Sequence, residues 1–254
     1  MTLLHLALAP GDIKTYEKEL KRCRFALASY YYIKNLDYDF QSNFEHFILD
    51  SGAFSLFGQK PLSKDEMIKY CDEYADYIIK YNIKNFVELD VDVIYGYDFV
   101  LYLRKRLEDK VGRQCIPIWH LSRGKEEFIK MCKEYTYAGI GGIAKKNKIS
   151  KYKHLYKHLN RLARKHNCKL HGMGFTPTKN LIDYEFYTVD STSWSSGSRF
   201  ATIYEFKNNG LSTLKKPQGK KLVDYKKLNK HNINEWIKYQ EYCYNKGFMN
   251  RKGI

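Results

Sequence analysis

Residues 170–190 read LHGMGFTPTKNLIDYEFYTVD, and this stretch contains two short apolar segments that each end in small or polar residues. Leu170–Phe175 and Tyr187–Asp190 have the length and apolar content of strands that are buried on both faces. The stretch Thr178–Tyr184 between them predicts a short helix. A strand, a helix and a second strand in this order are typical of a parallel sheet covered by helices.

The same unit recurs along the rest of the chain, and the number of its repeats indicates the fold. With the two strands above, the candidates number eight, which predicts an α/β fold closed into a (β/α)8 barrel of the TIM type. The other strand candidates are Leu4–Leu8, Phe25–Tyr30, Phe47–Asp50, Phe86–Val91, Ile116–His120 and Ala138–Gly142.

Amphipathic stretches fill most of the gaps between the strands. Ser63 and Glu66 form a capping box that opens a helix through about Tyr81. The segment Ile33–Glu45 is polar and predicts a loop, so the barrel is expected to be somewhat irregular there. Further helices are expected at Ile13–Cys23, Asp98–Glu108, Lys125–Tyr135, Ile149–His166 and Ile233–Tyr244.

The length of the chain predicts a single domain. A chain of 254 residues is the usual size of one α/β barrel. We therefore expect residues 1–254 to form one domain, with a C-terminal basic and helical extension at about residues 207–254. A hairpin is expected at Phe200–Phe206 and a basic stretch covers Lys215–Lys227.

The charge of the chain points to a polyanionic partner. It has 44 Lys and Arg residues against 28 Asp and Glu residues, a formal net charge of +16. Such a surface attracts nucleic acid through its phosphates. The alternative is that the excess of Lys only keeps the protein soluble. A neutral sugar substrate explains this charge poorly, which disfavours a carbohydrate hydrolase.

Cysteine spacing and hydropathy restrict the other classes of site. The six cysteines are scattered without a C-x-x-C pair, so no metal is predicted. The N-terminal apolar run Leu3–Ala9 is too short to span a bilayer and lacks a preceding basic region, so no membrane association is predicted. A reducing, cytoplasmic setting is expected.

Polar and small residues interrupt the apolar runs at the carboxyl ends of the strand candidates. In an α/β barrel these ends converge on one mouth, where catalytic groups lie. A single Asp after a strand is more often the N-cap of the next helix, but several such residues together favour a site. These residues are Asp50, Asp90, Asp92, His120, Gly141, Gly142, His171, Met173 and Asp190.

Two carboxylates across a pocket suit retaining glycosyl chemistry, in which one attacks the anomeric carbon and the other moves the protons. Asp50 and Asp190 have the positions for these roles. Glu88, Asp90 and Asp92 alternate along one strand, where an inward carboxylate pairs with the donor edge of a guanine-like base. The alternative is a salt bridge to an inward Lys or Arg.

Gly141 and Gly142 remove side chains where a planar ligand could lie against backbone amides. Tight packing or a bulge explains the pair equally well.

Collinear motifs on these strands resemble those of a known family. In order and spacing they resemble the tRNA-guanine transglycosylase superfamily, and most closely its DNA deazaguanine transglycosylase (DpdA-like) branch of phages and bacterial modification clusters. The resemblance covers about residues 45–205. Its motifs are Leu49-Asp-Ser-Gly-Ala-Phe-Ser55, Phe86-Val-Glu-Leu-Asp90, Gly139-Ile-Gly-Gly-Ile-Ala144, Gly172-Met-Gly-Phe-Thr-Pro177 and Val189-Asp-Ser-Thr-Ser-Trp194.

The resemblance implies the roles of individual residues. Asp190 is expected to be the covalent nucleophile and Asp50 the general acid/base. Ser196 and Arg199 fall in the segment that the family uses for the sugar-phosphate backbone. For base binding, by reading the base edge, contacting it with amides or stacking on it, the resemblance implies Asp90, His120, Gly141, Gly142 and Met173. Asp92 and His171 join the expected base-binding set because of their positions on the strands.

The departures from the family indicate the substrate. The tRNA enzymes carry a Cys/Cys/Cys/His zinc site after the nucleophile strand, whereas here only Cys243 follows Asp190. The sequence therefore predicts an enzyme that replaces guanine in DNA by a free 7-deazaguanine base without a cofactor. The alternatives are the same exchange on tRNA and a non-catalytic nucleic-acid-binding barrel. Accessory proteins or a homodimer are possible partners, and the cytoplasm would be that of a host cell if a phage encodes the chain.

Overall fold

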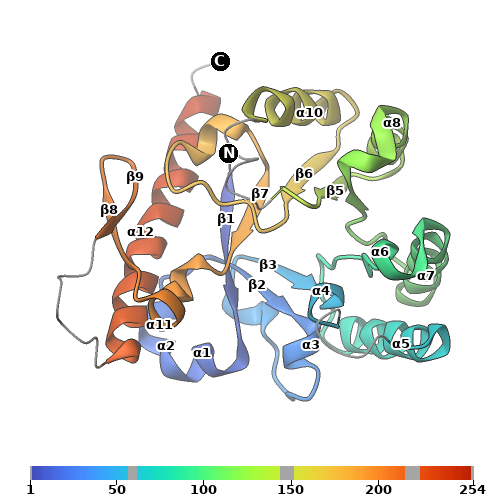
Figure 1. Cartoon of the computed structure of the whole chain (residues 1–254), viewed down its shortest axis with the longest axis horizontal. Helices are drawn as coiled ribbons and strands as arrows, with labels where there is room; N and C mark the ends of the chain where they lie inside the picture. The colour runs from blue at the N-terminus through green and yellow to red at the C-terminus, as the bar shows by residue number, and fades with distance from the viewer. Residues whose placement is uncertain (1, 57–61, 144–151, 215–223, 253–254) are drawn as a thin grey trace.

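Parallel strands at the centre of the molecule form one curled sheet (Figure 1). This computed structural model describes residues 2–56, 62–143, 152–214 and 224–252. The seven strands are ordered β3-β2-β1-β7-β6-β5-β4, and every neighbouring pair is parallel, as predicted. They are β1 (Leu3–Leu8), β2 (Phe25–Ser29), β3 (His46–Asp50), β4 (Ile118–Trp119), β5 (Tyr137–Ile140), β6 (Lys169–Gly172) and β7 (Thr188–Ser191).

The expectation of a closed, somewhat irregular eight-stranded barrel was wrong, because one strand candidate does not form a strand. Phe86–Val91 contributes only isolated bridges, from Leu49 to Phe86 and from Val87 to Ile116. These bridges link the β3 and β4 edges of the sheet. The described architecture is therefore a seven-stranded, curled half-barrel.

A glutamate side chain ends the ladder between the bridging segment and β4. The Glu88 N–H donates to the Ile116 carbonyl at 3.1 Å, as in a parallel ladder. The next bond of such a ladder would join the Ile118 N–H to the Glu88 carbonyl. Instead, the Ile118 N–H donates to Glu88 Oε1 at 2.6 Å. The side chain takes the place of the backbone acceptor, and regular pairing stops.

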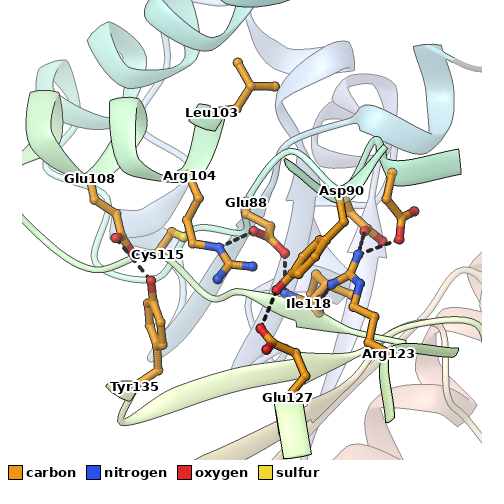
Figure 2. A network of polar contacts seen from close by, with 12 residues as sticks. Glu88, Asp90, Leu103, Arg104, Glu108, Cys115, Ile118, Arg123, Glu127 and Tyr135 are labelled. Atoms are coloured by element: carbon orange, nitrogen blue, oxygen red, sulfur yellow. Dashed lines mark hydrogen bonds and ion pairs between the residues drawn. The ribbon is translucent and has the colours of Figure 1, made fainter. Parts of the chain in front are cut away.

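The same glutamate forms a buried ion pair with a helix. Glu88 Oε2 lies 2.6 Å from Arg104 Nε on α7 (Tyr97–Val111), and the two side chains are 0% and 8% exposed (Figure 2). Burial raises the pKa of Glu88, although Arg104 opposes the shift. Of the two alternatives considered for Glu88, the structure has the salt bridge.

Removing one partner of this pair is expected to destabilise the fold strongly. Arg104→Met leaves the Glu88 carboxylate buried without its counter-charge, which costs about 3–5 kcal/mol of unfolding free energy. The matched control is Arg106→Met on the same helix, which breaks the more exposed pair to Asp72 and should cost about 1 kcal/mol or less. Urea unfolding measures both, and equal losses would contradict the assignment.

Helices follow most strands. The capping box of α5 is confirmed: Ser63 Oγ accepts the Glu66 N–H at 3.2 Å, and Glu66 Oε2 accepts the Ser63 N–H at 2.6 Å. The helices not yet given are α1 (Pro10–Thr15), α2 (Glu17–Leu20), α3 (Tyr30–Ile33), α4 (Ala53–Leu56), α5 (Lys64–Lys80), α6 (Asp92–Tyr95), α8 (Gly124–Glu134), α10 (Lys153–Lys165), α11 (Ser196–Phe200) and α12 (Tyr225–Lys252).

Short 3-10 turns replace regular helices in several connections. The helix expected at Thr178–Tyr184 is reduced to the turn η3 (Leu181–Tyr184). The first residues of the helix expected at Ile149–His166 lie outside the described residues. The other turns are η1 (Gln41–Asn43), η2 (Leu121–Arg123) and η4 (Ser193–Ser195).

Apolar side chains pack on both faces of the sheet. The larger cluster lies between the sheet and its helices and includes residues from Leu4 to Cys243. A smaller cluster on the concave face contacts Met173. The concave face positions the polar residues of the candidate active site. The buried residues of the smaller cluster are Leu27, Ile48, Val87, Ile116 and Ile118.

The C-terminal region packs against the sheet. The helix α12 lies beside β1 (Figure 1), where Gln240 Nε2 donates to the Leu4 carbonyl at 2.7 Å. The hairpin expected at Phe200–Phe206 forms further along the chain, as β8 (Ile203–Lys207) and β9 (Gly210–Leu214). Most of the basic stretch Lys215–Lys227 lies outside the described residues.

All six cysteines are buried and free. Over the four described ranges, no helix combines the length and the apolar character needed to cross a bilayer.

Candidate active site

Asp190 lies on β7, and donors from β6 and the loop after it hold one of its oxygens. Asp190 Oδ1 accepts the Gly174 N–H at 2.6 Å and lies 3.2 Å from His171 Nε2. The Thr176 hydroxyl donates to the Asp190 carbonyl at 2.6 Å. No hydrogen bond to Asp190 Oδ2 occurs among the described residues. One carboxylate oxygen is therefore fixed by two donors, whereas the other accepts no hydrogen bond from the described residues.

Asp50 ends β3, and the turn that follows it supplies a backbone donor. The Gly52 N–H donates to Asp50 Oδ2 at 2.9 Å. Gly52 has φ +80°, and a Cβ there would lie 2.5 Å from Tyr31 Cβ. Only glycine fits this turn, because both the backbone conformation and the space exclude a side chain.

The two carboxylates lie within electrostatic reach of each other. Along the sheet, β2 and β1 separate β3 from β7, so the curl of the sheet brings Asp50 and Asp190 together. Burial raises the pKa of Asp50 to about 6, the Gly52 N–H opposes this shift, and the charge of Asp190 adds to it. Their expected separation of roughly 5–8 Å stays a prediction.

Neutralising Asp190 should lower the pKa of Asp50. A negative charge nearby disfavours the ionised carboxylate, so Asp190→Asn removes one cause of the raised pKa while burial remains. We expect the pKa of Asp50 to fall from about 6 but to stay above its ordinary value. Carbon-13 NMR titration of the Asp50 carboxyl group measures it. An unchanged pKa would mean that the two groups do not interact.

A second polar cluster lies at the β4 side of the same edge. His120 Nε2 is 2.6 Å from Asp90 Oδ2. Arg123 Nη2 lies 2.6 Å from Asp92 Oδ2 and 3.3 Å from Asp90 Oδ1, and its guanidinium carbon lies 4.1 Å from the Tyr97 ring centroid. Figure 2 shows the Arg123 side chain pointing toward Asp90. Both oxygens of Asp90 are thus engaged.

This cluster carries its own counter-charge. Burial alone would lower the pKa of His120, but the hydrogen bond and the charge of Asp90 outweigh it and raise the pKa. One donor atom from each of Asp90, Asp92 and His120 lies within 4.8 Å of the others, a spacing that could hold a metal ion. Arg123 already places a positive charge beside both carboxylates, so ion pairs and hydrogen bonds hold this cluster together.

The glycine pair borders a cavity of about 230 Å³ between β5 and α10. A Cβ on Gly141 would lie 2.4 Å from His120 Cε1, so glycine is required for the imidazole to lie against this backbone. Gly142 is exposed, as a backbone contact to a ligand requires. Asp50 and Asp190 are not among the residues that line this cavity. Met173 is half-buried and packs on the concave-face cluster.

Of the two residues expected to contact the sugar-phosphate backbone, only Ser196 has a side chain that the structure describes. Ser196 begins α11, and its hydroxyl is buried without a hydrogen-bond partner among the described residues. A buried hydroxyl does not reach a phosphate in this conformation. The side chain of Arg199 lies outside the described residues. Both roles stay predictions.

His171 takes a different position from the one expected. Its side chain is fully buried beneath Asp190 and has no surface to offer a base. The reason is the alternation of β6, which points this side chain into the sheet interior next to β7. We therefore reassign His171 from the base-binding set to the partner of Asp190.

Sequence reasoning missed Arg123, the Thr188 hydroxyl that contacts His171, and the Tyr137 hydroxyl that contacts Thr188. Arg123 lies three residues beyond His120 in a turn, and its position after a strand end is the only signal that the sequence offers. Thr188 and Tyr137 sit within strands, where their residue types are common in any sheet.

Comparisons with known proteins do not assign the chain to a family. No protein-family model matches the chain, and no characterised protein matches it.

Proposed function

We propose that this chain is a base-exchange transglycosylase that replaces guanine in DNA by a 7-deazaguanine derivative through a glycosyl-aspartate intermediate. The observation that carries the proposal is the pair of carboxylates at the carboxyl ends of β3 and β7. Burial raises the pKa of Asp50 to about 6, and the negative charge of Asp190 contributes to this rise. Such a pair suits one group that transfers protons near neutral pH and one that attacks carbon.

The reaction proceeds in two displacements. Asp190 Oδ2 attacks the anomeric carbon and forms a C–O bond while the C–N bond to guanine breaks, and Asp50 gives its proton to the departing base. The incoming deazaguanine then loses its ring N–H proton to Asp50. Its nitrogen attacks the same carbon, and the bond to Asp190 breaks. Asp50 is protonated again at the end, so the protons balance.

The second cluster supports recognition of a purine edge. Asp90 offers carboxylate oxygens to the donor edge of guanine, and the exposed Gly142 supplies backbone groups. Base binding would exchange the hydrogen bonds that Asp90 now makes to His120 and Arg123 for bonds to the base. Arg123 also pairs with Asp92, so its positive charge continues to offset part of the negative charge of the cluster. A base within a duplex must leave the stack to reach this edge, at a cost of roughly a few kcal/mol.

The test is nucleoside mass spectrometry of DNA and tRNA from cells supplied with 7-deazaguanine bases, with and without the protein. We expect modified deoxynucleosides in DNA only when the protein is present. Modification confined to tRNA would instead support the tRNA alternative. No modification in either nucleic acid, together with intact binding, would favour a non-catalytic binding protein.

DNA binding should weaken steeply with salt. The formal charge of +16 indicates phosphate contacts by Lys and Arg, which release counterions on binding. If the protein makes about six phosphate contacts, raising salt from 50 to 200 mM should reduce affinity by roughly 10³-fold. Fluorescence anisotropy with a labelled oligonucleotide measures this slope. A flat salt dependence would reassign the positive charge to solubility.

A further inference from the structure

A chain of hydrogen-bonded, buried side chains leads away from Asp190 along the concave face of the sheet. His171 Nε2 lies 3.2 Å from Asp190 Oδ1, and His171 Nδ1 lies 2.8 Å from Thr188 Oγ1. The Thr188 hydroxyl is hydrogen-bonded in turn to the Tyr137 hydroxyl. His171 and Thr188 are fully buried. Tyr137 also lines a cavity of about 200 Å³ near the amino-terminal ends of the strands.

When Asp190 is ionised and the His171 ring carries a single proton, the hydrogen atoms of this chain have one consistent arrangement. A carboxylate only accepts, so His171 Nε2 must carry the proton that it donates. The neutral ring then accepts at Nδ1, which requires the Thr188 hydroxyl to donate to it. Tyr137 donates to Thr188 in its turn. Burial raises the pKa of Tyr137, which keeps this hydroxyl protonated and able to donate.

The two histidines next to His171, His5 and His46, are uncharged. His5 Nε2 lies 2.9 Å from His46 Nδ1, and the His5 ring centroid is 6.3 Å from that of His171. Burial lowers the pKa of His46 to about 4 and that of His5 well below its ordinary value. Both rings are therefore neutral at neutral pH, and neither competes for the Asp190 carboxylate.

We propose that His171, oriented by Thr188 and Tyr137, is a positioning residue that holds Asp190 Oδ1 and leaves Oδ2 free to attack. This inference rests on the proposed function, because it assigns Asp190 as the nucleophile. The Gly174 N–H shares the task, since it donates to the same oxygen at 2.6 Å. The two donors also stabilise the carboxylate when it leaves the sugar in the second displacement, since negative charge returns to Oδ1 at that point.

The tautomer of His171 tests the chain directly in the whole protein. Nitrogen-15 NMR of the histidine rings, assigned with His171→Gln, should show His171 protonated at Nε2 and unprotonated at Nδ1 at neutral pH. Thr188→Val removes the donor to Nδ1 with little change of volume, and it should lead to a mixture of tautomers. A wild-type ring protonated at Nδ1, or at both nitrogens, would overturn the proposal.

Kinetics test the consequence for Asp190. Thr188→Val and Tyr137→Phe change neither carboxylate, yet Thr188→Val should lower kcat for base exchange by roughly 10- to 100-fold at unchanged KM, because a small misplacement of the nucleophile has an effect of this size. Tyr137→Phe should have a smaller effect in the same direction. His171→Gln keeps a donor and should retain more activity than His171→Leu. The matched control is Thr213→Val, at an exposed position of β9.

Unchanged kcat in Thr188→Val would overturn the positioning role, even where the tautomer is as expected. If the wild-type protein exchanges no base in any nucleic acid, the proposed function fails. The tautomer measurement then still decides whether His171 donates to Asp190 and accepts from Thr188, because it needs no substrate. The two failures are therefore distinguishable.

Discussion

Asp190→Asn is expected to abolish base exchange, with a residual rate roughly 10⁴-fold or more below that of the wild type. An amide does not attack an anomeric carbon as a carboxylate does, so the first displacement is lost outright. The fold should persist, because the amide oxygen can still accept the bonds that Oδ1 receives from Gly174 and His171. Discontinuous assays with labelled DNA and a deazaguanine base measure the rate.

The covalent intermediate gives the sharper readout of the same variant. Denaturing electrophoresis of the wild-type enzyme with a labelled oligonucleotide should reveal an adduct, and mass mapping should place it on Asp190. Asp190→Asn should form none. The matched control is Asp183→Asn, which changes an acidic residue in the partly exposed pair with Lys153. An adduct that survives in Asp190→Asn, or one that maps to Asp50 or Asp90, would assign the nucleophile to another strand.

The sequence predicted the strands and the polar edge of the sheet because both depend on local patterns. Short apolar runs predicted the strands to within a few residues at β1, β2, β3, β5 and β7. Since carboxyl ends of parallel strands share one edge, the positions of Asp50 and Asp190 followed from the pattern alone. The capping box of Ser63 and Glu66 is equally local, and it was confirmed.

The parts that the sequence did not predict depend on contacts between distant residues. Phe86–Val91 has the composition of a strand, but the Glu88 carboxylate takes the Ile118 amide from the ladder. Nothing near Glu88 in the sequence identifies Arg104 as its partner. Likewise, the sequence placed His171 near the mouth, whereas its burial beneath Asp190 depends on how β6 packs against β7.

Asp50→Asn is expected to slow base exchange by roughly 10²–10⁴-fold, the usual effect of losing general acid/base catalysis. Asp190 keeps its charge and its hydrogen bonds in this variant, so attack on the sugar stays possible. The departing base then has no proton donor, and the incoming base has no acceptor. The matched control is Asp39→Asn in an exposed turn before β3, which should retain full activity.

The pH profile separates a catalytic Asp50 from one that only shapes the turn. With a pKa of about 6, Asp50 is protonated below this pH and ionised above it. The first displacement needs the protonated form, so its rate in single-turnover experiments should fall as pH rises through about 6. The second displacement needs the ionised form and should show the opposite dependence. Both limbs should vanish in Asp50→Asn, and a limb that persists in this variant would show that another group transfers the proton.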